Sequence, residues 1–364
     1  MKLELIKTKL KEAVSIAERV TGKNLSLPIL SAILLEAKDN YLTIKATNLD
    51  VGLEIQLPAK ITEEGSVAVS AAVLSSFLGN ISREEKVKLE MVKENIHIST
   101  ESSSTLIKCF SAEDFPVIPR VADGNSFQFS ARDIVTGLRS VSYASSLSDI
   151  KPEIASVYVY HDGKELVFVA TDSFRLAEKR INIRDKEKEF PSVIIPFKNV
   201  AELVKVFDGS DEDLKIEANK NQISFFTDNI HFTSRVIDGN FPDYQQIMPK
   251  KFKTEVVVGR EELLNALKLS NIFSDKFNQI NIKIAPKEKL FQINSQNQDV
   301  GENTVSLSAT LEGEDLEMSF NARYILDSFQ SISADSIVLK FDRPLLIEGV
   351  GERSFQYIVM PVNR

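Results

Sequence analysis

The side chains that most often perform catalysis are few in this sequence and lie far apart. The three histidines are His97, His161 and His231, and the single cysteine, Cys109, has no metal-ligand spacing with any of them. The sequence also contains no glycine-rich phosphate loop of either usual kind. We therefore interpret His97 and His231 as structural residues of strands and His161 as a residue of a hairpin turn. We expect neither a metal nor another cofactor.

Two acidic features remain as candidates for chemistry. Asp172 in the segment ATDSFRL has the look of a catalytic carboxylate, but an aspartate at a strand end more often bonds to the local backbone. Residues 211–213 (DED) could hold a divalent cation, although they form an isolated acidic turn. Nucleotidyl transfer or cleavage needs carboxylates that converge on two metals. The pattern therefore favours a binding or scaffold protein over an enzyme.

The elements that would position any such side chains occur three times along the chain. An amphipathic helix pattern begins near residues 10, 134 and 263, and two alternating strands, a third strand and a second short helix follow each time. Thr47, Thr171 and Ser295 occupy equivalent points, 124 residues apart. This repeat is too long for a solenoid unit, so each copy should form a domain with its own core.

Each copy has the pattern of two helices laid on strand-rich structure, which is an α+β architecture. We expect domains at residues 1–121, 126–248 and 253–364, joined by polar linkers that follow a proline. The buried face of the first helix is predicted to consist of Ile6, Leu10, Ala13, Val14, Ala17 and Val20. Hairpin turns are predicted at Asp162-Gly163, where both central positions of a type I′ turn need positive φ, and at Asp39-Asn40, Glu94-Asn95 and Lys220-Asn221.

Composition is that of an ordinary globular protein, with 43% apolar and 26% charged residues in 364. No apolar run approaches the length of a membrane span, and the N-terminus lacks the apolar core of a signal peptide. The lone cysteine fits a reducing compartment. We therefore expect a cytoplasmic protein.

Five stretches, in order along the whole chain, carry a resemblance to a known family. They are LPIL (27–30), AEDFP (112–116), ATDSFRLA (170–177), RVIDGNFPDY (235–244) and YIVMPV (357–362). With them the chain resembles the bacterial DNA polymerase III β subunits, the sliding clamps. The resemblance implies a non-catalytic accessory subunit of the DNA polymerase III holoenzyme, in which two three-domain protomers join head to tail. Helices would line the hole of the resulting ring, and sheets would form its outer wall.

A physical estimate supports a ring of six domains. A domain of about 120 residues, treated as a uniform sphere, is roughly 35 Å across. Six touching spheres in a circle leave a hole of roughly 35 Å, which admits a DNA duplex with a layer of water, whereas four leave roughly 14 Å. Two protomers of three domains therefore suffice to enclose DNA.

The net charge of −8 by itself argues against nucleic acid as a partner. The distribution of charge along the chain changes this conclusion. The expected helices together carry +5, which leaves −13 for the rest of the chain. A mildly basic lining would attract phosphates through water and suit sliding, while an acidic outside would discourage binding elsewhere. The alternative is that these helix faces are simply solvated. The candidate DNA-facing residues are Lys7, Lys11, Arg19, Lys23, Asn24, Arg132, Arg139, Lys198 and Lys205, with Asn24 at the position where relatives usually place a basic residue.

The resemblance also implies one apolar cleft for short linear peptides from the replicative polymerase subunit, the clamp loader and repair or translesion polymerases. Met, Pro and aliphatic side chains around a few polar groups suit such a cleft, although they also suit an ordinary inter-domain core. Phe174 and Gln246 stand where relatives often have polar or basic residues, which makes this cleft more apolar. The matching positions are Ile154, Thr171, Ser173, Phe174, Arg175, Leu176, Pro242, Gln246, Ile247, Phe277, Asn321, Tyr324, Pro344, Leu346, Met360, Pro361 and Val362.

Ring closure is expected at the two ends of the protomer. The candidate segments are residues 104–110 and 271–274, with Ile107 and Ile272 as the apolar contacts. Such a heterologous interface closes after two copies. Two other readings stay open from the sequence: a polymerase or nuclease catalytic subunit, and a repeat scaffold protein that would be monomeric and bind no DNA.

Overall fold

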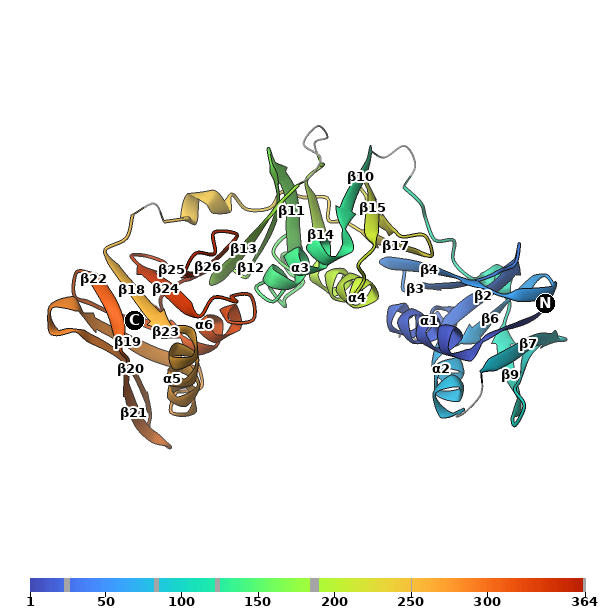
Figure 1. Cartoon of the computed structure of the whole chain (residues 1–364), viewed down its shortest axis with the longest axis horizontal. Coiled ribbons are helices and arrows are strands. Elements are labelled where there is room, and N and C mark those ends of the chain that lie inside the picture. Colours follow the sequence, from blue (N-terminus) through green and yellow to red (C-terminus); the bar gives the residue numbers. More distant parts are fainter. Residues whose placement is uncertain (23–26, 82–84, 122–124, 184–189, 250, 363–364) are drawn as a thin grey trace. The chain divides into compact units, whose positions relative to one another are not determined.

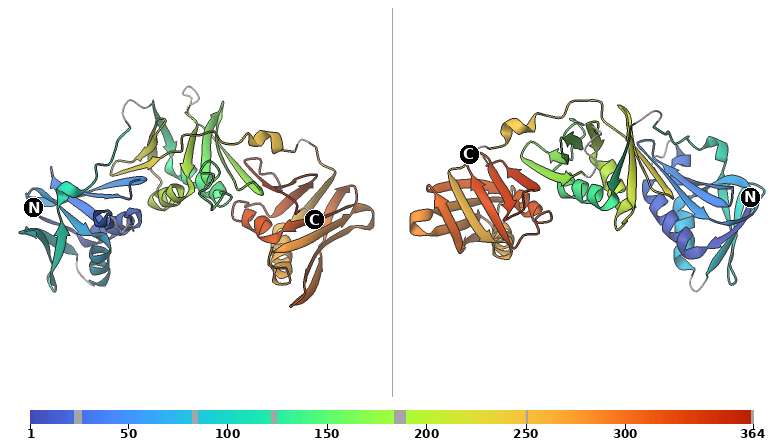
Figure 2. Two further views of the ribbon diagram at one scale, coloured as in Figure 1. Left: turned by 180° about the vertical axis from the view of Figure 1, so that it is seen from behind. Right: turned by 45° about the horizontal axis from the view of Figure 1, so that its top comes forward.

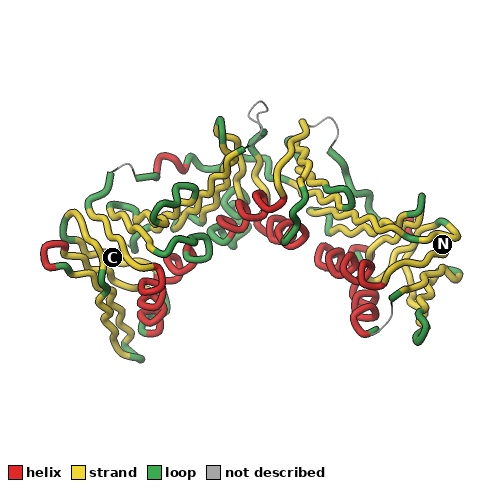
Figure 3. The backbone as a smooth tube through the Cα atoms, in the orientation of Figure 1, coloured by secondary structure: helices red, strands yellow, loops and turns green. Residues whose placement is uncertain are grey.

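The computed structural model describes residues 1–22, 27–81, 85–121, 125–183, 190–249 and 251–362 (Figure 1). Runs of strands lie between the helices along the chain (Figure 3). No helix in these ranges has the length and apolar character needed to cross a membrane. The α-helices are α1 (Lys7–Val20), α2 (Ala71–Asn80), α3 (Ala131–Ser142), α4 (Phe197–Phe207), α5 (Arg260–Ile272) and α6 (Ala322–Ser328), and the 3-10 helices are η1 (Pro28–Ser31), η2 (Ala112–Asp114), η3 (Tyr244–Ile247) and η4 (Pro286–Glu288).

The chain packs into two compact units. Unit 1 consists of residues 1–135 and 198–238 and contains one 13-stranded sheet. Its strand order is β10-β15-β16-β17-β4-β3-β2-β6-β9-β8-β7-β1-β5. The strands are β1 (Lys2–Ile6), β2 (Ala32–Lys38), β3 (Tyr41–Thr47), β4 (Val51–Pro58), β5 (Lys60–Glu63), β6 (Gly65–Ser70), β7 (Lys86–Val92), β8 (Asn95–Ser99), β9 (Ser104–Phe110), β10 (Asn125–Ser130), β15 (Asp213–Ala218), β16 (Gln222–Phe226) and β17 (Ile230–Arg235).

Unit 2 consists of residues 136–197 and 239–364. It contains a nine-stranded sheet in the order β14-β11-β12-β13-β26-β25-β24-β18-β22 and a four-stranded sheet in the order β21-β20-β19-β23. Figure 2 shows the ribbon from two further sides. The strands are β11 (Ser156–Asp162), β12 (Glu165–Thr171), β13 (Arg175–Asn182), β14 (Val193–Pro196), β18 (Thr254–Gly259), β19 (Gln279–Ala285), β20 (Leu290–Asn297), β21 (Gly301–Ser306), β22 (Ala309–Gly313), β23 (Leu316–Asn321), β24 (Ser336–Phe341), β25 (Leu345–Gly349) and β26 (Phe355–Val359).

The two units do not coincide with the three copies of the repeat. The middle copy gives β10 and β15 to β17 to the sheet of unit 1, and it gives β11 to β14 to the large sheet of unit 2. In unit 1, β17 pairs with β4 of the first copy, and in unit 2, β13 pairs with β26 of the third copy. Backbone hydrogen bonds therefore run across the boundaries of the repeat. Each long sheet is shared between two copies.

The internal repeat is visible in the backbone of two equivalent loops. The hydroxyl of Thr47 donates to the carbonyl of Val51 at 2.8 Å, and the hydroxyl of Thr171 donates to the carbonyl of Arg175 at 2.7 Å. Leu49 and Ser173, the third residue of each loop, have φ of 78° and 77°. In the third copy β20 continues through residue 295, so this loop is absent there.

The first helix buries the expected face with one exception. Leu10, Ala13, Val14, Ala17 and Val20 of α1 are all buried, and the helix packs against α2, β3 and β4. Ile6 was predicted on the same face, and this prediction is wrong. Ile6 ends β1, which pairs with β7, and its side chain is 48% exposed. Helical periodicity cannot extend into residues that strand pairing holds extended.

The strand pairing places some hairpin turns where the sequence predicts them and others elsewhere. Asp39 and Asn40 both have positive φ, as a type I′ turn requires. The predicted type I′ turn at Asp162-Gly163 is wrong, because Asp162 pairs with Glu165 and only Gly163 of the two-residue turn has positive φ.

One other turn differs from its predicted position: Val92 pairs with Asn95, so the turn consists of residues 93–94. The predicted turn at Lys220-Asn221 is confirmed, because these two residues are the centre of the loop 219–222. The backbone of Asn219 donates to the carbonyl of Gln222 at 2.9 Å, and the side chain of Asn219 accepts from the backbone of Asn221 and Gln222.

Candidate functional site

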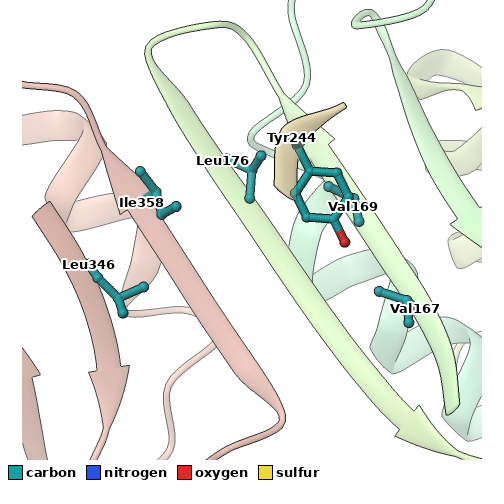
Figure 4. Close-up of a cluster of buried hydrophobic side chains, with 6 residues drawn as sticks. All are labelled: Val167, Val169, Leu176, Tyr244, Leu346 and Ile358. Carbon is teal, nitrogen blue, oxygen red and sulfur yellow. The ribbon is translucent and has the colours of Figure 1, made fainter. Parts of the chain in front are cut away.

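The large sheet of unit 2 carries a buried apolar cluster on one face (Figure 4). Leu176 of β13 lies directly opposite Ile358 of β26, and Ile358 lies opposite Leu346 of β25. Because directly paired residues of neighbouring strands point to the same face, these side chains form a continuous apolar row. Val167 and Val169 of β12 and Tyr244 of η3 complete the cluster. Of the predicted cleft residues, Leu176 and Leu346 therefore belong to a buried floor.

The loop before β13, whose Leu176 belongs to this floor, carries Phe174. Thr171 is buried, and its hydroxyl accepts from the backbone of Ser173 at 3.1 Å. The side chain of Asp172 accepts from the backbone of Phe174 and Arg175 at 2.9 and 3.0 Å. These local bonds hold the sharp turn and leave the Phe174 ring 60% exposed. The interpretation of Asp172 as a residue that bonds local backbone is confirmed.

Arg175 is a structural cation. Its guanidinium donates to Asp172 at 3.0 Å, to Asp327 of α6 and to the carbonyl of Tyr143 at 2.8 Å. It also lies over the ring of Tyr324, with 4.7 Å from its central carbon to the ring centroid. Burial opposes the charge, but Tyr357 and the two carboxylates raise the pKa of Arg175 above its ordinary value. The residue ties the loop to α6, and each of its three guanidinium nitrogens donates to a partner within unit 2.

The segment before β18 is anchored through a buried tyrosine. The Tyr244 hydroxyl donates to Glu178 and lies 2.8 Å from the Tyr160 hydroxyl. Glu178 is 3% exposed and also accepts from Arg180 at 2.7 Å. Burial and the adjacent Glu178 raise the pKa of Tyr244 above its ordinary value. This anchor places the following turn of η3 at the edge of the apolar floor, where Ile247 is 46% exposed.

Residues 360–362, near the end of the chain, are hydrogen-bonded to the loop before β13 and to β23. The backbone of Met360 donates to Phe174 at 2.8 Å, and the backbone of Val362 donates to Ser319 at 2.8 Å. Met360 and Val362 keep 37% and 39% of their surface exposed. Pro361 and Val362 also line a hollow of about 380 Å³, together with residues of β19 and β23. The tail is therefore fixed by backbone bonds while its side chains face outwards.

The remaining predicted cleft residues also lie in unit 2. Phe277 is 64% exposed, and its carbonyl accepts from the side chain of Asn321, which caps α6. Ile154 is half-buried after the turn at Lys151. Pro344 is buried, whereas Pro242 and Gln246 are exposed, and Gln246 donates to Asp243 at 2.8 Å.

The sequence did not single out Tyr244, Glu178 and Asp327 as parts of this site. Tyr244 ends the motif RVIDGNFPDY, which was the only available signal. The hydrogen-bonded partners are far apart in the sequence. Tyr244 lies 66 positions after Glu178, and Asp327 lies 152 positions after Arg175. Such pairs follow from tertiary packing, so no local pattern reveals them.

The predicted DNA-facing residues differ in how exposed they are. Lys11, Arg19, Arg132, Arg139 and Lys198 are exposed. Lys7 is half-buried, and its ammonium donates to the carbonyl of Ile81 at 2.5 Å after the end of α2. Lys205 forms an ion pair with Glu202 of its own helix at 2.9 Å. Lys23 and Asn24 lie outside the described residues.

The two apolar contacts predicted for ring closure differ in exposure. Ile107 is 6% exposed, and it is the one buried residue in the pattern of β9. Leu106 points the other way and is 57% exposed. Ile272, at the end of α5, is 62% exposed and stays available as a contact.

A second buried carboxylate lies in unit 1. Glu54 of β4 is 8% exposed, accepts from Arg120 at 2.9 Å and has His231 Nδ1 at 3.9 Å. Burial works against its charge, but His231 and Arg120 hold the pKa of Glu54 down at about 2. Arg120 lies near the end of the first copy of the repeat, so this pair fastens that end to the sheet.

The described residues contain no cluster of three or more His, Cys, Asp or Glu that could hold a metal. His97 lies 2.8 Å from Ser104 across a strand pair, and His231 stacks on Phe226 with 4.5 Å between ring centroids. His161 lies in β11 and pairs with Leu166, so its predicted place in the turn is wrong. The three histidines therefore make contacts within their own sheets.

Comparison with known families decides the identity. Family models of the DNA polymerase III beta subunit match in chain order: the N-terminal domain at residues 1–119, the central domain at 130–243 and the C-terminal domain at 245–363. The chain belongs to this family. Its fold is the three-domain sliding clamp fold, with helices and antiparallel sheets in every copy of the repeat.

Curated relatives and solved structures agree along the whole length. The beta sliding clamp of Synechococcus elongatus is 27% identical over 372 residues, covering 100% of this chain and 99% of the relative, and that of Bacillus subtilis is 26% identical over 378 residues, covering 100% of both. The DNA polymerase III beta subunit of Thermotoga maritima has a TM-score of 0.93 at 27% identity, covering 100% of this chain and 99% of that structure. A DnaN sliding clamp of Bartonella birtlesii, solved bound to griselimycin, has a TM-score of 0.94 at 27% identity with full coverage of both chains.

Membership in this family makes the chain a non-catalytic subunit of DNA polymerase III and a processivity factor. The alternative of a polymerase or nuclease catalytic subunit is not favoured. The resemblance found in the five sequence stretches is confirmed.

Proposed function

We propose that two copies of this chain join head to tail into a ring that encircles duplex DNA without reading its sequence. Each copy contributes three clamp domains, at residues 1–121, 126–248 and 253–364, and acts in the cytoplasm. Enclosure, rather than tight contact, holds the ring on DNA. The exposed cations of α1, α3 and α4 support this proposal, because a thin layer of positive charge attracts phosphates through water without fixing a register.

We further propose that unit 2 binds short peptides of the replicative polymerase subunit, the clamp loader and repair or translesion polymerases. One observation carries this part: unit 2 has a buried apolar cluster, and apolar side chains on loops and on the chain end of the same unit stay exposed. Phe174, Ile247, Phe277, Met360 and Val362, which we call the exposed apolar group, are between 37% and 64% exposed. Exposed apolar groups of this kind mark interaction sites, and the firmly bonded loops beneath them lower the cost of ordering on binding.

Ring closure is proposed to use Leu106 of β9 and Ile272 of α5. The two side chains are more than half exposed, at 57% and 62%. They lie on different parts of the chain, as a head-to-tail contact requires. Apolar side chains with this exposure would gain stability when a second copy covers them.

Retention on DNA tests the encirclement. The purified protein is loaded onto nicked circular DNA, and the fraction retained is followed before and after a restriction enzyme linearises the circle. A topological ring slides off the free ends, so we expect rapid loss after cutting and slow loss from the intact circle. Equal retention on both forms would mean that direct contacts, and not enclosure, hold the protein.

A further inference from the structure

A cationic hollow of about 590 Å³ lies in unit 2, away from the exposed apolar group. It forms where the second half of α3, β13, the first residue of α5 and residues 329–333 meet. Three of its lining side chains carry positive charge: Arg139, Lys179 and Arg260. The other described side chains around it bear hydroxyl, amide or apolar groups, and none is acidic. Such a lining has the composition of an anion site.

The guanidinium of Arg260 is held in one orientation by the protein itself. Its Nε donates to the carbonyl of Ile332 at 3.1 Å, and one Nη donates to the carbonyl of Phe329 at 2.9 Å. The group also lies over the Phe329 ring, 5.7 Å from the centroid. Arginine has five N–H donors, so donors remain after these two bonds. A fixed planar cation loses little freedom when it binds an oxyanion.

Lys179 supplies the second charge. Its ammonium donates to the Ser354 hydroxyl at 2.9 Å, and it forms no ion pair with any residue in the described ranges. Burial lowers the pKa of Lys179, and Glu352 only partly opposes this effect. Glu352 itself accepts a hydrogen bond from Ser333 at 2.5 Å and does not line the hollow. A bound anion would supply the missing countercharge.

We propose that this hollow binds a phosphate group, which Lys179, Arg139 and Arg260 hold by charge-assisted hydrogen bonds. Arg139 and Thr136 are exposed on α3, so the hollow opens toward the helix face that carries a proposed DNA-facing residue. A backbone phosphate of duplex DNA is therefore the source that the position favours, and this choice of source rests on the proposed function. A free phosphate compound has the same chemistry and is separated from DNA by the experiment.

Calorimetric titration with sodium pyrophosphate at low salt tests the site without DNA. The Lys179→Gln variant keeps a side chain that can reach Ser354 but loses the charge. We expect its affinity to fall about tenfold to a hundredfold, as for the loss of a hydrogen bond to a charged group. Lys164→Gln makes the same charge change at the exposed hairpin turn and should leave the affinity unchanged. Arg139→Gln is a second variant. It leaves the hydrogen bond of Lys179 to Ser354 and those of Arg260 to the backbone carbonyls in place, and it should also weaken pyrophosphate binding.

The titration has two outcomes that overturn the proposal. Either wild-type protein gives no heat with pyrophosphate, or Lys164→Gln weakens binding as much as Lys179→Gln, which would reduce the effect to net charge. The thermal midpoint of each variant is recorded beside the titration. A variant that has lost its folded signal is set aside, and Arg139→Gln then decides.

Binding to a short duplex over a range of salt concentrations identifies the source. If DNA supplies the phosphate, the slope of log Kobs against log salt should become shallower by about 0.9 in Lys179→Gln. An unchanged slope together with lost pyrophosphate binding supports the site but overturns the assignment to DNA. The pyrophosphate result does not depend on ring formation. Failure of this site and failure of the encirclement on circular DNA are therefore separate observations.

Discussion

Phe174→Ala is the most direct perturbation of the proposed peptide surface. The ring is 60% exposed, and the bonds that shape its loop come from Thr171 and Asp172, so they remain when the ring is removed. Truncation should therefore leave the fold intact, with a change in the free energy of unfolding below about 0.5 kcal/mol. Its effect should appear only when a partner covers the ring.

The expected loss of affinity follows from the exposed area. A phenylalanine side chain buries about 200 Å² when it is fully covered, so a ring that is 60% exposed offers roughly 120 Å² to a partner. Complete coverage would contribute about 3 kcal/mol at 25 cal/mol per Å². A peptide lying across one side of the ring covers about half of it. The predicted loss is then about 1.5 kcal/mol, which is a tenfold rise in Kd.

Fluorescence anisotropy with a labelled peptide from the replicative polymerase subunit measures this loss. Val300→Ala serves as control, because Val300 is 57% exposed in the same unit and belongs to no proposed site. The control should bind the peptide as the wild type does, and both variants should keep the wild-type dimer mass. A Kd for Phe174→Ala within twofold of wild type would refute the reasoning. So would an equal loss in Val300→Ala, since the effect would then be unspecific.

Four further outcomes are expected. Tyr244→Phe leaves Glu178 short of one hydrogen bond and should lower the free energy of unfolding by about 1.5–3 kcal/mol in urea titration; no change would show that the bond is not needed. The depressed pKa of Glu54 stabilises unit 1 above the ordinary value of 4.5, and this contribution should disappear as the pH falls from 4.5 towards 2, so that thermal midpoints drop in that window and stay level above it. Deleting residues 360–364 should abolish polymerase binding and keep the dimer, whereas loss of the dimer would make the tail structural. Light scattering should give twice the 40.7 kDa chain mass, and Ile272→Asp should give the single-chain mass; a wild-type monomer would contradict ring closure.

Much of the architecture could be predicted from periodicity and repetition. Five of the six residues proposed for the buried face of the first helix are buried, because a spacing of three and four places them on one side of α1. The exception, Ile6, marks the limit of the method. Whether a residue at the start of a helical pattern belongs to the helix depends on a neighbouring strand, here β7, which lies about 80 residues further along the chain.

The burial of Ile107 and the displaced turn after Asp162 follow from one physical property of strands. In a strand the two faces alternate with every residue, so a shift by one position exchanges inside for outside. Leu106 and Ile107 are equally apolar, and only the packing of unit 1 makes Leu106 the exposed one. The turn is displaced by one residue because the pairing of β11 with β12 sets its position. Local composition contains neither fact.

The candidate peptide surface was predicted from family resemblance, and its buried support was not predicted. Phe174, Met360 and Val362 stand at positions that sequence motifs identify, and they are exposed as a docking surface needs. The anchoring pair of Tyr244 and Glu178 requires two segments to meet in space. Motifs locate residues along the chain, but they do not indicate which buried charges hold those residues in place.

The duplicated loops explain why one peptide surface, and not two equal ones, is expected. In unit 1 the backbone of Arg235 donates to Asp50 at 2.8 Å, as the backbone of Met360 donates to Phe174 at 2.8 Å in unit 2. The strand pairing that follows is also equivalent, since β17 pairs with β4 as β26 pairs with β13. The same backbone frame therefore exists in both units. Unit 1 also has a hollow of about 700 Å³ lined by residues of its frame, among them Asp50 and Arg235.

The side chains on the two backbone frames differ in character, and the proposed peptide binding depends on this difference. Where unit 2 pairs Leu176 with Ile358 in an apolar floor, unit 1 pairs Gly52 with Thr233. A methyl group added to Gly52 would lie 2.6 Å from Ile118, so the connecting segment of the chain itself fills the space above that position. An apolar peptide would find no apolar floor there and would have to displace Ile118. Peptide affinity should therefore respond to substitutions in the frame of unit 2 and stay unchanged when Asp50 is replaced by Ala.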